Sequence, residues 1–90
     1  MSKFTEKQGQ YLAFIHTYAL LHGQAPSEAD MQAFFRVTPP TVHNMVLQLE
    51  ARGLITRTPR VARSIRLNVA EEELPALHRP VPIEFPVGDH

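Results

Sequence analysis

Arginine is the residue type in this sequence with the clearest chemical potential, and its placement is uneven. Residues 36–67 hold six arginines against one acidic residue, Glu50, which gives a net charge of +5. The six are Arg36, Arg52, Arg57, Arg60, Arg63 and Arg66. The planar guanidinium group donates paired hydrogen bonds that match phosphate oxygens and the edge of guanine. The segment therefore predicts a polyanion partner, with a solvated basic face as the alternative.

The overall composition hides this basic segment. The 90 residues carry nine basic and nine acidic side chains, a net charge of zero. Residues 68–90 carry five acidic groups against Arg79, a net charge of −4. This acidic end could fold back on the basic segment and lower nonspecific binding, could help the chain dimerise, or could be disordered.

Histidines and glutamates are the other groups that could carry chemistry. His16 and His22 lie six residues apart, so one helix face cannot present both to a metal ion. The run Glu71–Glu73 has no accompanying nucleophile with a base and no glycine-rich phosphate loop. We expect no enzymatic activity, no metal and no cofactor.

Length and composition narrow the class of protein further. A chain of 90 residues with no cysteine and no tryptophan fits one small domain without disulfides or thiol chemistry. No apolar run approaches the roughly 20 residues of a membrane span, and the N-terminus lacks a signal peptide. We expect a cytoplasmic protein with no membrane association and no small-molecule ligand.

Three helices are expected to position the arginines. The first runs from about Thr5 to His22, because Thr5 and Gln8 form a capping box before a helical apolar stripe. A short second helix follows its N-cap, Ser27. The third covers residues 39–52 and begins with proline at its first helical position.

Apolar residues recur with the helical period in each of these segments. They are Tyr11, Phe14, Ile15 and Tyr18, with Leu12, Ala19 and Leu21 at the margins of the stripe, then Met31, Phe34 and Phe35, then Val42, Met45, Val46 and Leu49. Only a tight turn fits between the second and third helices, which predicts a helix-turn-helix.

Beyond Gly53 the period changes to two. Residues 54–58 and 63–67 are expected to be strands, joined by a hairpin loop over 59–62. The predicted fold class is mainly α with a small β-hairpin, a winged helix-turn-helix of three helices and a two-stranded wing over 54–67. We assign residues 1–67 to this domain and residues 68–90 to an acidic, proline-rich C-terminal tail, in which the prolines favour an extended arm.

Several motifs, taken in order, resemble the N-terminal DNA-binding domain of LexA repressors. They are Phe4-Thr5-x-Lys7-Gln8, Gly23-x-x-Pro26-Ser27, Pro39-x-x-Val42, Leu49-Glu50-x-x-Gly53-Leu54-Ile55 and Arg63-x-Ile65-x-Leu67. The resemblance extends without gaps from Phe4 to Leu67. It implies a bacterial-type repressor domain that inserts its third helix into the major groove of double-stranded DNA and lays its wing along the phosphate backbone.

The sequence also departs from the LexA pattern. LexA proteins carry a second domain with a Ser-Lys site that cleaves an Ala-Gly bond between the domains. This sequence has no Ala-Gly dipeptide and no lysine beyond Lys7, so we do not expect self-cleavage. Because LexA dimers depend largely on that second domain, a homodimer is left open.

The predicted base-reading surface is the side of the third helix opposite its buried stripe, mainly toward its N-terminus. The expected readers are Pro40, Thr41, His43, Asn44, Leu47 and Gln48. Asn44 can pair with adenine, and Thr41 or Leu47 can contact a thymine methyl group. The alternatives are a surface or dimer contact for Leu47 and an ordinary solvated residue for Asn44.

Phosphate contacts are expected at the wing and at the start of the third helix. The expected residues are Thr38, Arg57, Arg60, Arg63 and Arg66. Arg60 lies at the predicted tip of the wing, whereas Arg57 could instead be the partner in a structural ion pair. The alternative for the whole chain is a winged helix that binds protein or RNA without sequence-specific DNA binding.

Overall fold

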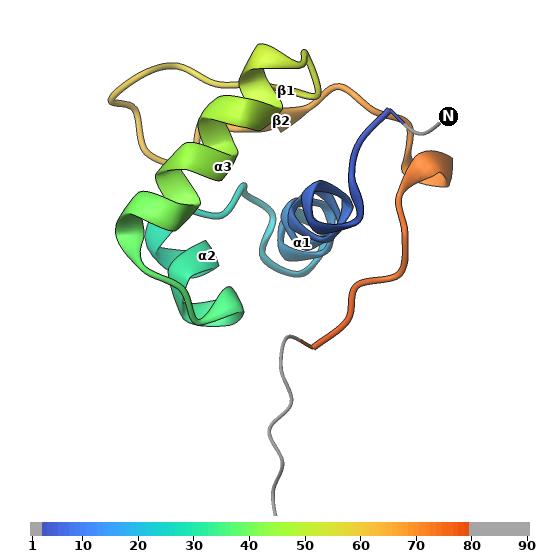
Figure 1. Ribbon diagram of the computed structural model, residues 1–90, viewed down its shortest axis with the longest axis horizontal. Helices are drawn as coiled ribbons and strands as arrows, with labels where there is room; N and C mark the ends of the chain where they lie inside the picture. The colour runs from blue at the N-terminus through green and yellow to red at the C-terminus, as the bar shows by residue number, and fades with distance from the viewer. Residues whose placement is uncertain (1–2, 80–90) are drawn as a thin grey trace, which may run out of the picture.

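The computed structural model describes residues 3–79 of the chain. Its elements are α1 (Glu6–His22), α2 (Glu28–Phe35), α3 (Pro39–Ala51), β1 (Ile55–Thr56), β2 (Arg66–Leu67) and the 3-10 turn η1 (Glu71–Glu73). In Figure 1, α2 and α3 lie to one side of α1, and the loop between β1 and β2 extends beside α3. Three helices and an antiparallel two-stranded hairpin confirm the predicted winged helix-turn-helix.

The first two helices begin at the predicted caps. The Thr5 hydroxyl accepts a hydrogen bond from the Gln8 backbone N–H at 3.1 Å, and the Gln8 amide oxygen accepts one from the Thr5 N–H at 2.9 Å. Ser27 and Asp30 form the same reciprocal pair at 3.1 and 2.9 Å. Each box satisfies N–H groups that the first helical turn leaves without partners.

The N-cap residue of α3 makes no side-chain capping hydrogen bond. We therefore expect the N-cap hydroxyls of α2 and α3 to contribute differently to stability. The Thr38 hydroxyl contacts the Thr41 hydroxyl at 2.9 Å and caps no backbone N–H. We expect Ser27→Ala to lower the free energy of unfolding by about 1 kcal/mol, and Thr38→Ala, the matched control, to lower it by only about 0.3 kcal/mol. Urea unfolding followed by circular dichroism measures both, and equal losses would contradict the assignment.

The core buries a wider face of α1 than the sequence predicted. Leu12, which was expected at the margin of the stripe, is fully buried, whereas Leu21, also expected at the margin, is 74% exposed. The middle of α1 is covered from two sides, because Val69, Leu74 and Leu77 from beyond β2 also pack against the core. The helical period marks one face of a helix and cannot show a second covering segment.

The wing has a shorter ladder and a longer loop than predicted. The sequence predicted strands over 54–58 and 63–67, with a loop over 59–62. The structure pairs Ile55 with Leu67 and Thr56 with Arg66. The two strands keep the predicted antiparallel arrangement, but the loop starts two residues earlier and ends three residues later.

Backbone conformation explains this difference. Arg60 and Arg63 adopt left-handed conformations, with φ of 67° and 59°, which interrupt an extended chain. The Ser64 hydroxyl closes the loop in place of a strand ladder. It accepts a hydrogen bond from the Thr58 N–H at 2.9 Å and donates one to the Thr58 carbonyl at 3.0 Å.

Residues 69–79, which we call the C-terminal strap, lie along α1 rather than over the wing (Figure 1). Gln10 on α1 holds the strap backbone at two points. Its amide nitrogen donates to the Ala76 carbonyl and its amide oxygen accepts from the His78 N–H, both at 2.8 Å.

Two acidic residues of the strap pair with the N-terminal half of the chain. Glu73 lies 3.1 Å from the Lys3 amine, and Glu71 lies 3.6 Å from the His16 ring. Within residues 3–79, neither carboxylate pairs with a wing arginine. The remainder of the predicted acidic tail, residues 80–90, lies outside the described residues. Among the helices between residues 3 and 79, none is long and apolar enough to cross a membrane.

Candidate nucleic-acid interface

One face of α3 is exposed along the length of the helix. Val42, Met45, Val46 and Leu49 are buried as predicted. All six expected base readers are exposed: Pro40, Thr41, His43, Asn44, Leu47 and Gln48. Hydroxyl, amide and imidazole groups dominate this face, so it can both donate and accept hydrogen bonds.

Three of the expected readers already have side-chain partners: Thr41, whose hydroxyl contacts that of Thr38, and also His43 and Gln48. The His43 Nδ1 lies 3.4 Å from the carboxylate of Glu28 on α2. The Gln48 Oε1 accepts a hydrogen bond from the Nε2 of Gln8 on α1, at 3.3 Å. Across residues 3–79, no three His, Cys, Asp or Glu side chains lie together in a way that could hold a metal ion.

The wing arginines differ in their contacts. The Arg57 Nε donates to the Glu50 Oε1 of α3 at 3.0 Å, and only 16% of the Arg57 side chain is exposed. The side chains of Arg60 and Arg66 are exposed and make no hydrogen bond or ion pair with another residue in the range 3–79. Arg60 and Arg66 therefore have guanidinium groups available for a ligand.

Arg63 fastens the wing loop to the helices. Its Nη1 donates to the Tyr18 hydroxyl at 3.2 Å, to the Ala25 carbonyl at 3.1 Å and to the Asp30 carboxylate at 3.0 Å. The Tyr18 hydroxyl and the Asp30 carboxylate both hold the pKa of Arg63 above its ordinary value. The Arg63 charge is thus shared with groups of the protein.

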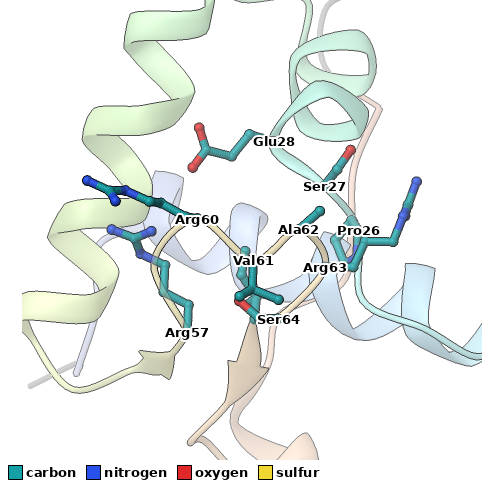
Figure 2. A pocket seen from close by; sticks show the side chains of 10 residues that line it. Pro26, Ser27, Glu28, Arg57, Arg60, Val61, Ala62, Arg63 and Ser64 are labelled. Atoms are coloured by element: carbon teal, nitrogen blue, oxygen red, sulfur yellow. The ribbon is translucent and has the colours of Figure 1, made fainter.

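An open pocket of about 320 Å³ separates the start of α2 from the wing loop. Figure 2 shows Arg57 and Arg60 on the α3 side of this pocket, whereas Arg63 turns away from them past Pro26. Glu28 projects into the space between α2 and α3. Glu28 lines the same pocket as Arg60 and contacts His43 on the exposed face of α3, so Arg60 lies near this face and can contact the same ligand.

Asp30 links the cap of α2 to the wing anchor and predicts an acid dependence. The Ser27 backbone N–H, and with it Arg63, holds the pKa of Asp30 below its ordinary value. The Asp30 carboxyl is therefore protonated at a higher pH in the unfolded chain than in the folded chain. The stabilising contribution of the ionised Asp30 is complete above the pKa of the unfolded chain and is lost as the pH falls through the pKa of the folded chain. We expect Asp30→Asn to flatten the loss of thermal stability between about pH 5 and pH 2; an unchanged acid slope would contradict this role.

The supporting roles of several residues were not predicted from the sequence. Gln8 was recognised only as part of a cap, Tyr18 only as a core residue, and Asp30 only as a capping-box partner. Their contacts with Gln48 and Arg63 join positions 33 to 45 residues apart. No local spacing in the sequence signals such pairs.

A helix-turn-helix whose second helix exposes a polar face, together with wing arginines that have no partner among residues 3–79, defines the winged-helix class of nucleic-acid-binding domains. The family model of the LexA DNA binding domain matches residues 1–64. The chain belongs to the LexA DNA-binding-domain family, which confirms the family predicted from the ordered motifs.

Relatives of this chain include several LexA repressors. That of Thermosipho melanesiensis is 42% identical over 74 residues, which cover 82% of this chain and 37% of the relative. That of Thermosipho africanus is 37% identical over 87 residues, which cover 97% of this chain and 39% of the relative. The chain therefore spans well under half the length of these relatives.

Proposed function

We propose that this domain binds double-stranded DNA sequence-specifically and represses transcription, with α3 in the major groove and the wing on the phosphate backbone. The observation that carries the proposal is the exposed polar face of α3 and, near it, the Arg60 guanidinium group, which makes no hydrogen bond or ion pair with another residue in the range 3–79. The major groove admits an α-helix, and its base edges present both donors and acceptors. Membership of the LexA DNA-binding-domain family supports DNA as the ligand, and the repressors among the relatives support repression.

The base contacts are assigned to the exposed face of α3. We assign them to Pro40, Thr41, His43, Asn44, Leu47 and Gln48. Asn44 lies on this face without a side-chain hydrogen bond to another residue in the range 3–79, so its amide can meet an adenine edge in paired fashion.

The phosphate contacts are assigned to the wing and to the start of α3. Thr38, Arg60 and Arg66 are exposed and are the main candidates. Arg57 and Arg63 remain predicted phosphate contacts. To bind a phosphate, however, each guanidinium group would have to contact it together with, or instead of, the carboxylate that lies 3.0 Å away. We therefore assign these two arginines primarily to holding the wing in place.

Two copies are expected to bind paired half-sites. A single recognition helix reads only a few base pairs, and a genome offers very many competing sites of that length. Two copies related by a two-fold axis would double the length that is read, at half-sites about one helical turn apart or a multiple of it.

Selection of bound sites from a random duplex pool tests the proposed function. An inverted repeat is the expected result. Asn44→Ala should cost about 1–3 kcal/mol on the selected site and relax the preference at one base pair of each half-site, while nonspecific affinity stays the same. Gln24→Ala, in the exposed loop before α2, is the control. A pool from which no sequence is enriched would refute sequence-specific binding.

A further inference from the structure

The amide of Gln8 connects the cap of α1 to the exposed face of α3. Gln8 is the only buried polar residue in the described part of the chain, with 5% exposure. Its oxygen accepts the Thr5 backbone N–H at 2.9 Å, and its nitrogen donates to the Gln48 oxygen at 3.3 Å. The side chain that caps α1 is therefore hydrogen-bonded to an expected base reader.

The chemistry of these groups fixes the direction of both hydrogen bonds. A backbone N–H can only donate, so the end of the Gln8 amide that faces Thr5 must be its oxygen. The nitrogen of Gln8 must then face Gln48. Because an amide nitrogen only donates, Gln48 must turn its oxygen inward to accept. The Gln48 nitrogen remains, and no residue between 3 and 79 accepts a hydrogen bond from it.

We propose that Gln8 is a positioning residue that makes Gln48 present N–H donors, rather than an acceptor, to DNA. This inference rests on the proposed function of α3 as the DNA-binding helix. A freely rotating glutamine amide can pair with adenine through one donor and one acceptor. A glutamine whose oxygen is held inward instead fits an acceptor on DNA, which is either the O6 and N7 edge of guanine or a phosphate oxygen.

The substitution Gln8→Glu reverses the hydrogen bonding at this point without removing the cap. Glutamate is common at this position of a capping box, so the new carboxylate can still accept the Thr5 N–H. It cannot donate to Gln48. We expect the Gln48 amide to rotate, donate its N–H inward to the carboxylate and turn its oxygen toward DNA.

Site selection and affinity measurements on the wild type and on Gln8→Glu provide the test. If Gln48 contacts a base, the preference at one base pair should change about tenfold, from guanine toward a base that offers an amino donor. If it contacts a phosphate, affinity should fall by a similar factor, about tenfold, on every sequence. Both effects must depend on Gln48.

A double-mutant cycle separates these effects from the added negative charge. The charge alone weakens binding to any DNA and persists when Gln48 is absent. Under the proposal, the additional effect of Gln8→Glu disappears in a Gln48→Ala background. Equal effects of Gln8→Glu in both backgrounds overturn the positioning role but leave DNA binding intact. A wild-type domain that binds no DNA instead refutes the proposed function.

Nuclear magnetic resonance of the free domain gives a readout that needs no DNA. In Gln8→Glu, the side-chain NH₂ protons of Gln48 should shift downfield and exchange more slowly with water than in the wild type. Unchanged Gln48 signals would overturn the proposal. If Gln8→Glu does not fold, Gln8→Met removes both hydrogen bonds and should leave Gln48 free, which broadens base preference; an unchanged preference would equally overturn it.

Discussion

Replacing Arg60 and Arg63 singly should weaken DNA binding in two distinguishable ways. Arg60→Ala should make the slope of log K against log salt concentration shallower by about 0.9, because one phosphate-neutralising charge is lost. Arg60 is suited to this role because its exposed side chain makes no ion pair with any residue between 3 and 79. Its loss should weaken binding to specific and nonspecific DNA alike.

Arg63→Ala should lower affinity about 10–100-fold with nearly the same salt slope. The three hydrogen bonds from its Nη1 hold the loop against α1 and α2, and Asp30 already neutralises its charge. Without them the wing must be ordered on binding. Fixing the backbone of one residue costs about 1–2 kcal/mol, so ordering one or two residues accounts for the expected loss.

Titrations at several salt concentrations separate the two roles. Arg66→Ala is the control for Arg60, because it removes another exposed wing arginine and should change the slope by the same amount. If Arg63→Ala makes the slope shallower as much as Arg60→Ala does, then Arg63 contacts phosphate directly and its role as an anchor is wrong.

Removing residues 69–90 should lower the free energy of unfolding by about 2–3 kcal/mol. Val69, Leu74 and Leu77 are half-buried against the core, and full burial of one such side chain contributes about 1.5–3 kcal/mol. The two hydrogen bonds between the Gln10 amide and the strap backbone, one donated and one accepted by Gln10, contribute about 1 kcal/mol each. The entropy of ordering the strap opposes these contributions, so the expected net loss is smaller than their sum.

Chemical denaturation of two truncated forms checks this expectation. A chain that ends after Asn68 loses every strap contact, whereas one that ends after Arg79 keeps every contact that the structure describes. Gln10→Ala should reproduce about 1–2 kcal/mol of the loss in the intact chain. Equal stabilities of the two truncated forms would show that the strap contributes nothing. Nonspecific DNA affinity of the same forms reports separately whether the acidic residues weaken binding.

The helices and their order could be predicted because their signals are local. The capping boxes at Thr5 and Ser27 involve residues three positions apart, and the buried stripe of α3 repeats with the helical period. The wing was predicted less well. The left-handed conformations of Arg60 and Arg63 cannot be recognised from an alternating pattern of apolar and polar residues, so the predicted strands were longer than the observed ones.

The sequence by itself determined the winged-helix class, the family and the exposed face of α3, because these depend on short-range spacing and on side-chain type. The tertiary structure decided what each polar group on that surface is free to do. Six arginines look alike in the sequence, yet Arg57 and Arg63 are paired with carboxylates, whereas Arg60 has no such partner between residues 3 and 79. The Gln48 amide is oriented by Gln8, 40 residues away along the chain. Hydrogen bonds and ion pairs between distant residues form only when the helices have packed, so the interface follows from the packing as well as from its residues.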